Sequence, residues 1–393
     1  MSATRAGTRR VLFLAWAPFF SGAERALVRA LQGLNPARYE PFVVVGTDGE
    51  LASQLRSMGV SHQVAPVRPL DRRSPLAGVC SVAAIFGAAR RHRVSLIHAN
   101  DVPSFQPGGY VARALGIPAI AHVRFPDTLE GYRWFLRSRF ALALFVSEEQ
   151  RRAAVEVAPE LFARRSEVLH DCADYQGEWT PDERLRVRRD LGLSEQATVI
   201  AIAGQVAEIK GIWDFVEAAR IMVGRGSSAE FVVLGDDLKT SGLVRRDMQE
   251  RVTALGLGAR FTFLGFRPDA SRLAQAFDVI AVPSHVEPFG LAALEGSAAG
   301  RAVVASQVGG LPEIVVDRET GLIVPPREPA SLASALETLV NDPALRAGIG
   351  SAGRRRAREK FSIEAYGPRL EAIYDRLCSS PALAAGAENM EPV

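Results

Sequence analysis

Two glutamates lie on either side of a strand-to-helix corner in the second half of the sequence. Glu287 and Glu295 belong to HVEPFGLAALEGSAAG (285–300), and a Pro-Phe-Gly turn follows the first of them. The preceding DVIAVPS is typical of a buried strand, so Glu287 would stand at the carboxyl end of a strand, where open α/β sheets bind ligands. Two adjacent hydroxyls, such as a ribose diol, would satisfy both oxygens of a half-buried carboxylate at Glu295.

The turn between the two glutamates also offers backbone donors. If a helix begins near Gly290 or Leu291, the N–H groups of Phe289, Gly290 and Leu291 face the same space as Glu287, and a helix N-terminus attracts anions. The alternative is that Glu295 stabilises its own helix dipole from the first turn while Glu287 forms a surface salt bridge. The spacing alone leaves both interpretations open.

Two further strand-to-helix corners suit a phosphate group. After ATVIAIAG (197–204), Gln205 leads to Lys210-Gly211 and a helix, which would place a mobile positive charge beside helix-initiating amides. In FFSGAER (19–25), Gly22 would let the backbone approach a phosphate closely. A surface loop and an ordinary turn glycine are the alternatives. FFSGAER is not GxGxxG and no GxxxxGK[ST] occurs, so neither a dinucleotide fold nor a P-loop has motif support.

His98 and His122 each lie inside an apolar, strand-like run. Each ring is either a hydrogen-bonded part of the core or a ligand contact. His122 occupies the carboxyl half of its run and is followed by Arg124, which places two donors near one end of a sheet. We therefore expect a functional role for His122 and a structural one for His98.

The composition is that of an ordinary globular protein of two domains. The chain has 393 residues, 48% of them hydrophobic and 23% charged, and a formal charge of +3, which gives no support for a nucleic-acid partner. Its three cysteines are far apart and show no CxxC or Cys/His spacing, so neither a disulfide framework nor a zinc site is predicted. A reducing cytoplasm is the simplest compartment.

The N-terminus imitates a signal peptide, with arginines before the apolar run VLFLAWAPFF (11–20). The run is too short to span a bilayer, and a helical pattern follows it. We interpret it as a buried first strand that leads through a glycine loop into a helix.

Short apolar runs alternate with stretches of helical spacing, which is typical of parallel sheets covered on both faces. The alternation pauses at HDCADYQGEWTPDE (170–183). We expect domains at 1–175 and 176–362, then a broken amphipathic helix at 363–380 and a disordered tail at 381–393. Strands are expected at 11–17, 40–46, 95–100, 119–125 and 141–147, and at 197–204, 230–236, 260–266, 278–284 and 301–306.

Together these segments resemble the retaining glycosyltransferases of family 4, which have the GT-B fold. The resemblance covers nearly the whole chain and is specific in the C-terminal half, where the E-x7-E pair is the most recognisable feature. The segments that carry it are SGAER, GQVAEIKG, LGD (234–236), HVEPFGLAALE, GGLPEIVVDRETGLIVPP, SLASALETLV and FSIEAYGPRLEAIY. It implies an α/β protein of two Rossmann-like domains facing across a cleft, with the C-terminal helix crossing back to the N-terminal domain.

The resemblance also implies roles for the candidate residues. Glu295 would bind the ribose hydroxyls, Glu287 the hydroxyls of the donor sugar, and Lys210 the diphosphate as it leaves. Breaking a sugar–diphosphate bond builds negative charge on the phosphate, which a lysine and aimed amides stabilise. The remaining donor contacts would come from His122 to the sugar, and from Gly22 and the amides of Phe289, Gly290 and Leu291 to the phosphates.

The chain departs from the family pattern at three places. Gln205 follows Gly204 where the family usually has Arg; glutamine can donate to a phosphate but brings no charge. Ser-Gly-Ala-Glu (21–24) replaces GGxE, and Asp-Cys-Ala-Asp (171–174) replaces the usual NGVD. These departures put rate and donor choice in doubt.

The expected function is the transfer of a hexosyl group from a nucleoside-diphosphate sugar to an acceptor hydroxyl with retention, in bacterial polysaccharide or glycolipid assembly. Gln205 motivates one alternative, a pseudo-enzyme that acts as a partner subunit. A sugar-nucleotide epimerase of the same fold is disfavoured, because the E-x7-E pattern belongs to the transferases.

The expected partners are the nucleotide sugar and a carbohydrate or lipid-linked acceptor, with no metal, no other cofactor and no nucleic acid. GYRWFLRSRF (131–140) interleaves aromatic and basic residues and could touch anionic lipid at the inner face of the cell membrane. A half-buried ordinary helix is the simpler interpretation of this segment.

Overall fold

The computed structural model describes residues 8–71, 74–138, 140–175, 177–237 and 240–379. The chain divides into two compact units: unit 1, Met1–Cys172 with Ile363–Val393, and unit 2, Ala173–Ser362. The chain thus leaves unit 1 after Cys172 and returns to it at Ile363. The expected boundary at 175 falls just inside unit 2, and the tail expected at 381–393 lies outside the described residues.

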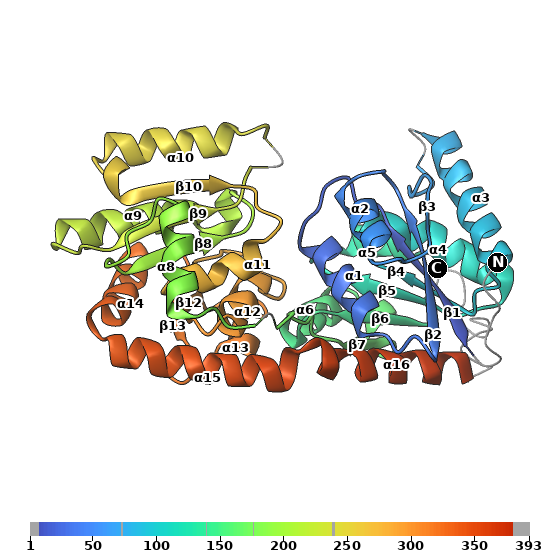
Figure 1. Cartoon of the computed structure of the whole chain (residues 1–393). Helices are drawn as coiled ribbons and strands as arrows, with labels where there is room; N and C mark the ends of the chain where they lie inside the picture. The colour runs from blue at the N-terminus through green and yellow to red at the C-terminus, as the bar shows by residue number, and fades with distance from the viewer. Residues whose placement is uncertain (1–7, 72–73, 139, 176, 238–239, 380–393) are drawn as a thin grey trace. The chain divides into compact units, whose positions relative to one another are not determined.

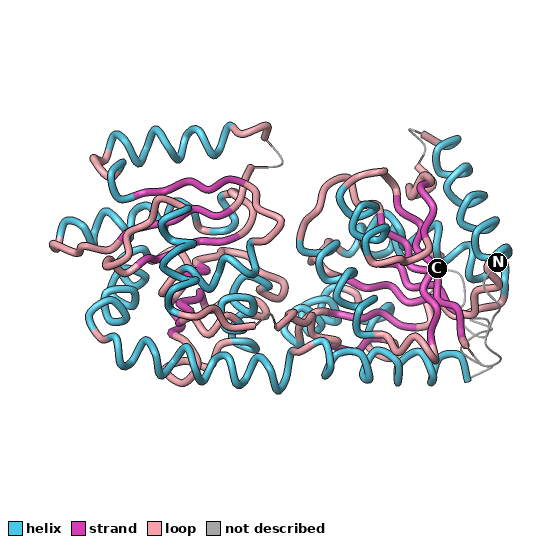
Figure 2. The backbone as a smooth tube through the Cα atoms, in the orientation of Figure 1, coloured by secondary structure: helices cyan, strands magenta, loops and turns pink. Residues whose placement is uncertain are grey.

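Unit 1 is built on a parallel sheet whose strand order, within the described residues, is β3-β2-β1-β4-β5-β6-β7 (Figures 1 and 2). In β1, Phe13 enters one hydrophobic cluster while its neighbours Leu12 and Leu14 enter another, as the two-residue period of a strand buried on both faces requires. The strands are β1 (Arg9–Ala15), β2 (Tyr39–Val45), β3 (His62–Val64), β4 (Leu96–Ala99), β5 (Ala119–Val123), β6 (Leu142–Phe145) and β7 (Ser166–Val168).

Helices cover both faces of this sheet. The cluster that contains Phe13 is closed by α1 (Gly22–Gly33), α2 (Glu50–Ser57) and α16 (Ile363–Ser379). The cluster that contains Leu12 is closed by α3 (Pro75–Arg91) and α4 (Val102–Leu115). A third cluster beside β4, β5 and β6 takes side chains from α4, α5 (Leu129–Leu136), α6 (Glu148–Val157) and α7 (Pro159–Phe162).

The expected strand at the N-terminus is confirmed as β1, and α1 follows it. The interruption expected near the last helix lies at Ser362, and α16 itself is unbroken, because it continues through Pro368. Its packing against α1 holds it: a Cβ on Gly367 would lie 2.0 Å from the carbonyl oxygen of Gly33, so the two backbones touch. The missing N–H of proline leaves one backbone hydrogen bond of α16 unmade, and the packing on α1 keeps the helix continuous.

Unit 2 is a second parallel sheet, with the order β10-β9-β8-β11-β12-β13 among its described residues. Read from the first strand of each unit, both orders follow the doubly wound pattern, with a switch point between β1 and β4 and another between β8 and β11. The strands are β8 (Val199–Ala203), β9 (Glu230–Leu234), β10 (Phe261–Gly265), β11 (Val279–Val282), β12 (Ala302–Ser306) and β13 (Leu322–Val324). The helices are α8 (Pro181–Asp190), α9 (Ile212–Gly224), α10 (Leu243–Ala254), α11 (Ala270–Leu273), α12 (Leu291–Ala298), α13 (Leu311–Ile314), α14 (Pro329–Asn341) and α15 (Pro343–Phe361).

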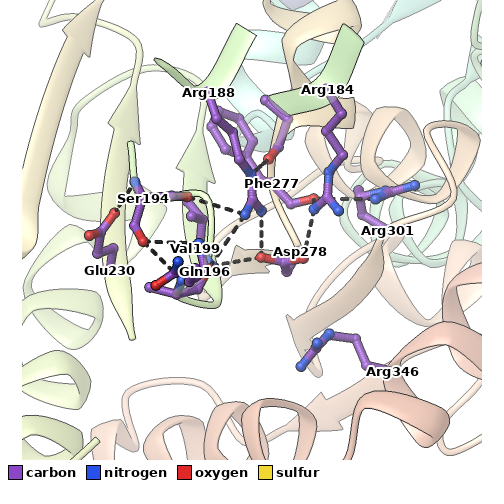
Figure 3. A network of polar contacts seen from close by, with 12 residues as sticks. Arg184, Arg188, Ser194, Gln196, Val199, Glu230, Phe277, Asp278, Arg301 and Arg346 are labelled. Carbon is purple, nitrogen blue, oxygen red and sulfur yellow. Dashed lines mark hydrogen bonds and ion pairs between the residues drawn. The ribbon is translucent and has the colours of Figure 1, made fainter. Parts of the chain in front are cut away.

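The amino edge of the unit 2 sheet is tied to α8 by Asp278 (Figure 3). Arg184 and Arg188 of α8 each form an ion pair with this carboxylate at 2.6 Å, and the backbone N–H of Val199 donates to it at 2.8 Å. Burial acts to raise the pKa of Asp278, but the two arginines outweigh burial and hold the pKa below its ordinary value. This edge is therefore occupied by structural contacts, which leaves the carboxyl edge for a ligand.

No helix within the described ranges is both long and apolar enough to cross a membrane.

Candidate functional site

The loops after β8 and β11 meet at the carboxyl edge of the unit 2 sheet. Strands β8 and β11 are neighbours, so the segments that follow them leave the sheet side by side at its switch point. Gly211 has φ +70°, and a Cβ on it would lie 1.9 Å from the carbonyl oxygen of Pro283. The N–H of His285 donates to the carbonyl of Ile209 at 2.8 Å. Glycine at 211 therefore allows the two loops to touch and brings Lys210 next to the β11 loop.

Lys210 and Glu287 form an ion pair at this edge, although 77 residues separate them in the sequence. Lys210 Nζ lies 2.8 Å from Glu287 Oε2, and the Ser284 hydroxyl donates to the same oxygen at 3.1 Å. The two side chains are only 23% and 11% exposed. The salt bridge considered for Glu287 thus exists, but it is largely buried and its partner is the lysine expected to bind phosphate.

The loop after β12 fixes the backbone of Glu287. The N–H of Gly310 donates to the Glu287 carbonyl at 3.1 Å, and a Cβ on Gly309, which has φ +51°, would lie 1.8 Å from the same oxygen. Both glycines belong to the GGLPEIV segment that the sequence singled out. Glu287 is therefore held from its backbone as well as from its side chain, so its carboxylate has a defined position.

Helix α12 begins at Leu291 with Gly290 as its N-cap, in the left-handed region at φ +117°. No side chain caps this end, so the first amides of α12 point out of the helix as donors. The Phe289 ring is buried and packs edge to face on Phe361, so the ring itself does not face a ligand. Glu295 is 8% exposed and lies in the second turn, which rules out a first-turn partner of the helix dipole.

Gln205 follows β8 at the same edge. The chain turns at Gly204, which has φ +128°, and a Cβ on Gly235 would lie 1.7 Å from the Gly204 carbonyl oxygen, so the ends of β8 and β9 touch. The Gln205 Nε2 group is buried and has no hydrogen-bond partner in the part of the chain that the structure describes. A buried donor without an acceptor costs about 1–3 kcal/mol. A phosphate oxygen would remove that cost.

In unit 1, His122 stands at the carboxyl edge of the sheet inside a chain of hydrogen bonds. Its Nδ1 lies 3.3 Å from Arg124 Nη2 and 3.1 Å from His98 Nε2, while His98 Nδ1 lies 2.8 Å from the Tyr374 hydroxyl. A guanidinium can only donate, so His122 Nδ1 accepts and the ring proton is on Nε2. His98 then donates from its Nε2 and accepts from Tyr374. His98 therefore orients His122.

The His122 Nε2–H group is left as a donor. This atom is buried and has no hydrogen-bond partner within the described stretches. The whole residue is also buried, so a ligand reaches it only if neighbouring groups move. Burial lowers the pKa of His122 well below its ordinary value, and the charge of Arg124 lowers it further. The ring is therefore a neutral hydrogen-bond donor and not a proton shuttle.

The positive charge of Arg124 is balanced by the carboxylate of Asp171. Its Nη1 lies 2.6 and 2.8 Å from the two carboxylate oxygens, and both side chains are 7% exposed. Arg124 Nη2 also donates to Asn100 Oδ1 at 3.1 Å, and Asn100 donates to the Ala23 carbonyl at 3.2 Å. The ion pair thus connects the β4 and β5 loops to the end of unit 1 at Asp171.

The two buried histidines should make the protein less stable in acid. Burial and Arg124 lower the pKa of His98 to about 3, and the pKa of His122 also lies well below its ordinary value. Below about pH 6.5 the two histidines are protonated in the unfolded chain but stay neutral in the folded chain. Each ring therefore lowers the free energy of unfolding by up to about 1.4 kcal/mol per pH unit as the pH falls. Urea unfolding between pH 7 and pH 5 measures this slope.

His98→Gln is the matching variant, because glutamine keeps a donor near His122 but does not titrate. We expect its stability to fall with decreasing pH less steeply than that of the parent chain, by the contribution of one ring. An unchanged slope would contradict the assignment of His98 as a neutral buried group.

Gly22 is the first residue of α1 and is exposed. Glu24 caps this end of α1: its Oε2 accepts from the backbone N–H of Ser21 at 2.8 Å and from the Ser21 hydroxyl at 2.6 Å. Gly22 and His122 belong to unit 1, whereas the other expected site residues belong to unit 2. The structure thus brings together Lys210, Gln205, Glu287, Phe289, Gly290, Leu291 and Glu295 on one sheet edge.

Several residues at these edges escaped the sequence reasoning. Ser284 holds Glu287, and His285 Nε2 lies 2.7 Å from Asp214 Oδ2 on α9. Asn100 supports Arg124, and His98, expected to be structural, positions His122. A polar residue at the end of an expected strand, such as Ser284 or Asn100, was a usable signal. Within the described residues, no three His, Cys, Asp or Glu side chains gather as metal ligands would.

Comparison with known proteins gives the family. The family model described as Glycosyl transferases group 1 matches residues 183–356, and the one described as Glycosyltransferase Family 4 matches residues 20–174. A D-inositol 3-phosphate glycosyltransferase of Rhodococcus opacus is 38% identical over 325 residues, which cover 76% of this chain and 72% of that protein. The chain belongs to the group 1, family 4 glycosyltransferases.

Other relatives extend this result. An alpha-D-kanosaminyltransferase of Streptomyces kanamyceticus is 28% identical over 72% of this glycosyltransferase and 78% of its own chain. The crystal structure of Anabaena Alr3699/HepE in complex with UDP-glucose matches with a TM-score of 0.83 and 24% identity, over 94% of this chain and 100% of that one. A sucrose-phosphate synthase of Thermosynechococcus elongatus matches with a TM-score of 0.74, 21% identity and coverages of 94% and 99%. These structures confirm the expected GT-B class with two Rossmann-like domains.

Proposed function

We propose that this glycosyltransferase moves a hexosyl group from a nucleoside-diphosphate sugar to an acceptor hydroxyl and retains the anomeric configuration. The observation that carries the proposal is the Lys210–Glu287 pair at the switch point of unit 2. A cation and a carboxylate held together at a ligand-binding edge suit a substrate that offers both a diphosphate and sugar hydroxyls.

In the proposed complex the ligand replaces the internal ion pair. The ammonium of Lys210 and the first amides of α12 donate hydrogen bonds to the diphosphate. The hydroxyls of the donor sugar donate to the carboxylate of Glu287. Glu295, one turn further along α12, binds the two ribose hydroxyls. Gln205 donates its free Nε2–H to a phosphate oxygen. Every charged group that loses a partner thereby gains another one, which keeps desolvated charges paired.

The bond between the anomeric carbon and the diphosphate breaks as negative charge grows on the leaving phosphate. Lys210 and the amides of Gly290 and Leu291 stabilise that charge where it develops. The leaving phosphate accepts the proton of the acceptor hydroxyl on the same face of the sugar, which gives retention. In unit 1, the Nε2–H group of His122 is a donor that suits a sugar hydroxyl, and Gly22 is a position where backbone can approach a phosphate. The proposed step needs no metal, because Lys210 and the amides supply the positive charge.

We place the reaction in the cytoplasm, in bacterial polysaccharide or glycolipid assembly. Cys80, Cys172 and Cys378 are all free thiols, which suits a reducing compartment. Alr3699/HepE, which shares the fold, has been crystallised with UDP-glucose, so a hexose donor is a natural first choice. The acceptor is a carbohydrate or a lipid-linked carbohydrate. The relatives named for D-inositol 3-phosphate and kanosamine widen the choice to small polyols and amino sugars.

Thermal unfolding with UDP, GDP, ADP, CDP and dTDP tests the donor site. We expect one nucleotide to stabilise the protein by about 2.7 kcal/mol at a hundredfold excess over its Kd. Glu295→Ala should lose this stabilisation, because the ribose hydroxyls lose their carboxylate. The matched control is Glu250→Ala on α10, since Glu250 is exposed in the same unit.

The same experiment separates the enzyme from the pseudo-enzyme that Gln205 suggested. A nucleotide shift that disappears in Glu295→Ala, together with hydrolysis or transfer of the matching sugar, supports the enzyme. No shift from any nucleotide would leave the two glutamates as inherited scaffold and favour a partner subunit. A shift that survives in Glu295→Ala would contradict the placement of the ribose.

A further inference from the structure

Helix α3 has an outward face without a polar partner. The helix carries no charged residue between Pro75 and Ala89, and its serine, Ser81, is buried. Leu76 is 78% exposed and Val79 is 56% exposed, the highest values among the large hydrophobic side chains of unit 1 in the described ranges. A surface helix normally turns polar residues to water, and one that is apolar all round is normally covered.

The exposed residues form one continuous stripe. Leu76, Val79, Cys80, Ala83 and Gly87 recur at helical spacing and are all exposed. They lie opposite the residues that pack on the sheet, namely Gly78, Ser81, Ile85, Ala88 and Ala89. From Leu76 to Gly87 the stripe is about 17 Å long at 1.5 Å per residue. We call it the α3 face. Figure 1 shows α3 on the outside of unit 1.

Exposed arginines lie near the α3 face. Arg90 and Arg91 are exposed in the last turn of the helix. Arg68 is exposed and lies beside the middle of α3, because its N–H donates to Ser81 Oγ at 3.1 Å. Arg137 is exposed and donates to the carbonyl of Leu70, whose Cα would be 2.7 Å from a Cβ on Gly78. The C-terminal end of the apolar stripe is therefore basic, and Arg68 and Arg137 lie beside the helix.

The charge in this part of the sequence is strongly one-sided. Residues 51–100 contain seven arginines and a single acidic residue, Asp71, whereas the whole chain has a formal charge of only +3. The rest of the chain is thus slightly acidic, and the positive charge is concentrated in this part of the sequence. An apolar stripe with arginines at one end and beside the helix is complementary to a bilayer surface that carries anionic headgroups.

We propose that the α3 face docks this protein on an anionic membrane surface, with Leu76 and Val79 inserted among the acyl chains and the arginines on the headgroups. A second copy of the chain fits less well, because the arginines of two copies would repel each other. Helix α5, where aromatic residues suggested lipid contact, presents less apolar surface, because Tyr132 and Leu136 are buried in the core. The proposal does not depend on the transfer reaction.

Co-sedimentation with vesicles tests the proposal. The parent chain is expected to bind vesicles rich in phosphatidylglycerol and not pure phosphatidylcholine, and to be released by salt. The double variant Leu76→Ser/Val79→Ser should bind at least about tenfold less tightly, because the apolar contribution to insertion is lost. Leu243→Ser is the matched control, since Leu243 is 53% exposed on α10 of unit 2. The pair Arg90→Glu/Arg91→Glu should weaken binding by a similar factor.

Three outcomes would overturn the proposal. The parent chain could fail to bind anionic vesicles, or the serine variant could bind them as the parent does. The parent could also form a dimer without vesicles that the serine variant does not form, which would assign the α3 face to a second copy. Unchanged thermal unfolding and an unchanged nucleotide shift in the serine variant show that fold and donor site are intact, so the two proposals fail independently.

Discussion

Replacing Lys210 by alanine is expected to lower kcat by about a hundred- to a thousandfold, with little change in the KM for the acceptor. Lys210 meets the charge that grows on the leaving phosphate, so its contribution is larger in the transition state than in the bound donor. Steady-state transfer, measured with the nucleotide sugar that the unfolding experiment identifies, gives both constants.

Two variants serve as controls for Lys210→Ala. Lys360→Ala removes an exposed lysine from the last turn of α15 and should leave kcat unchanged. Lys210→Arg keeps the charge and should recover part of the rate. Because Lys210→Ala leaves Glu287 without its ion-pair partner, its unfolding must be measured as well. Full turnover by a folded Lys210→Ala protein would falsify the assigned role.

Replacing Asp171 by alanine is expected to lower the free energy of unfolding by about 3–5 kcal/mol. Arg124 is then left buried with a positive charge and without its carboxylate. Removing one partner of a buried ion pair costs far more than removing one partner of an exposed pair. Urea unfolding of unit 1, followed by near-UV circular dichroism, measures the difference.

Two comparisons make this prediction specific. Asp48→Ala breaks the pair of Asp48 with Arg56, whose side chains are 63% and 54% exposed, and should cost less than about 1 kcal/mol. The double variant Arg124→Met/Asp171→Leu removes both charges and should recover much of the loss. If Asp171→Ala cost no more than Asp48→Ala, the pair would not be the buried interaction described above.

The sequence predicts the interior of both sheets well. A strand covered on both faces is a continuous apolar run, and each expected run, such as 11–17 or 278–284, became a strand. The strands that it missed, β3, β7 and β13, lie at sheet edges and are three residues long. His62–Val64 illustrates the reason: an edge strand packs on few neighbours, so it needs no apolar run.

The candidate site was predictable in its residues but not in its contacts. Lys210 and Glu287 each stand out by their place after an apolar run, yet their ion pair depends on β8 and β11 being neighbours. Nothing local in the sequence specifies that order of strands. The link from Tyr374 to His98 spans 276 residues and depends on the return of the chain to unit 1, so it needed the three-dimensional structure.

That return has a consequence for synthesis on the ribosome. Unit 2 is one continuous stretch, residues 173–362, whereas unit 1 needs the last helix, because Tyr366, Leu370 and Tyr374 pack in the same cluster as Phe13. The first half of the chain therefore emerges with part of one sheet face uncovered, namely the part that α16 covers, until the second half has been made. Unit 2 can close before unit 1 does, and a nascent chain that stops short of α16 exposes apolar surface that chaperones and proteases recognise.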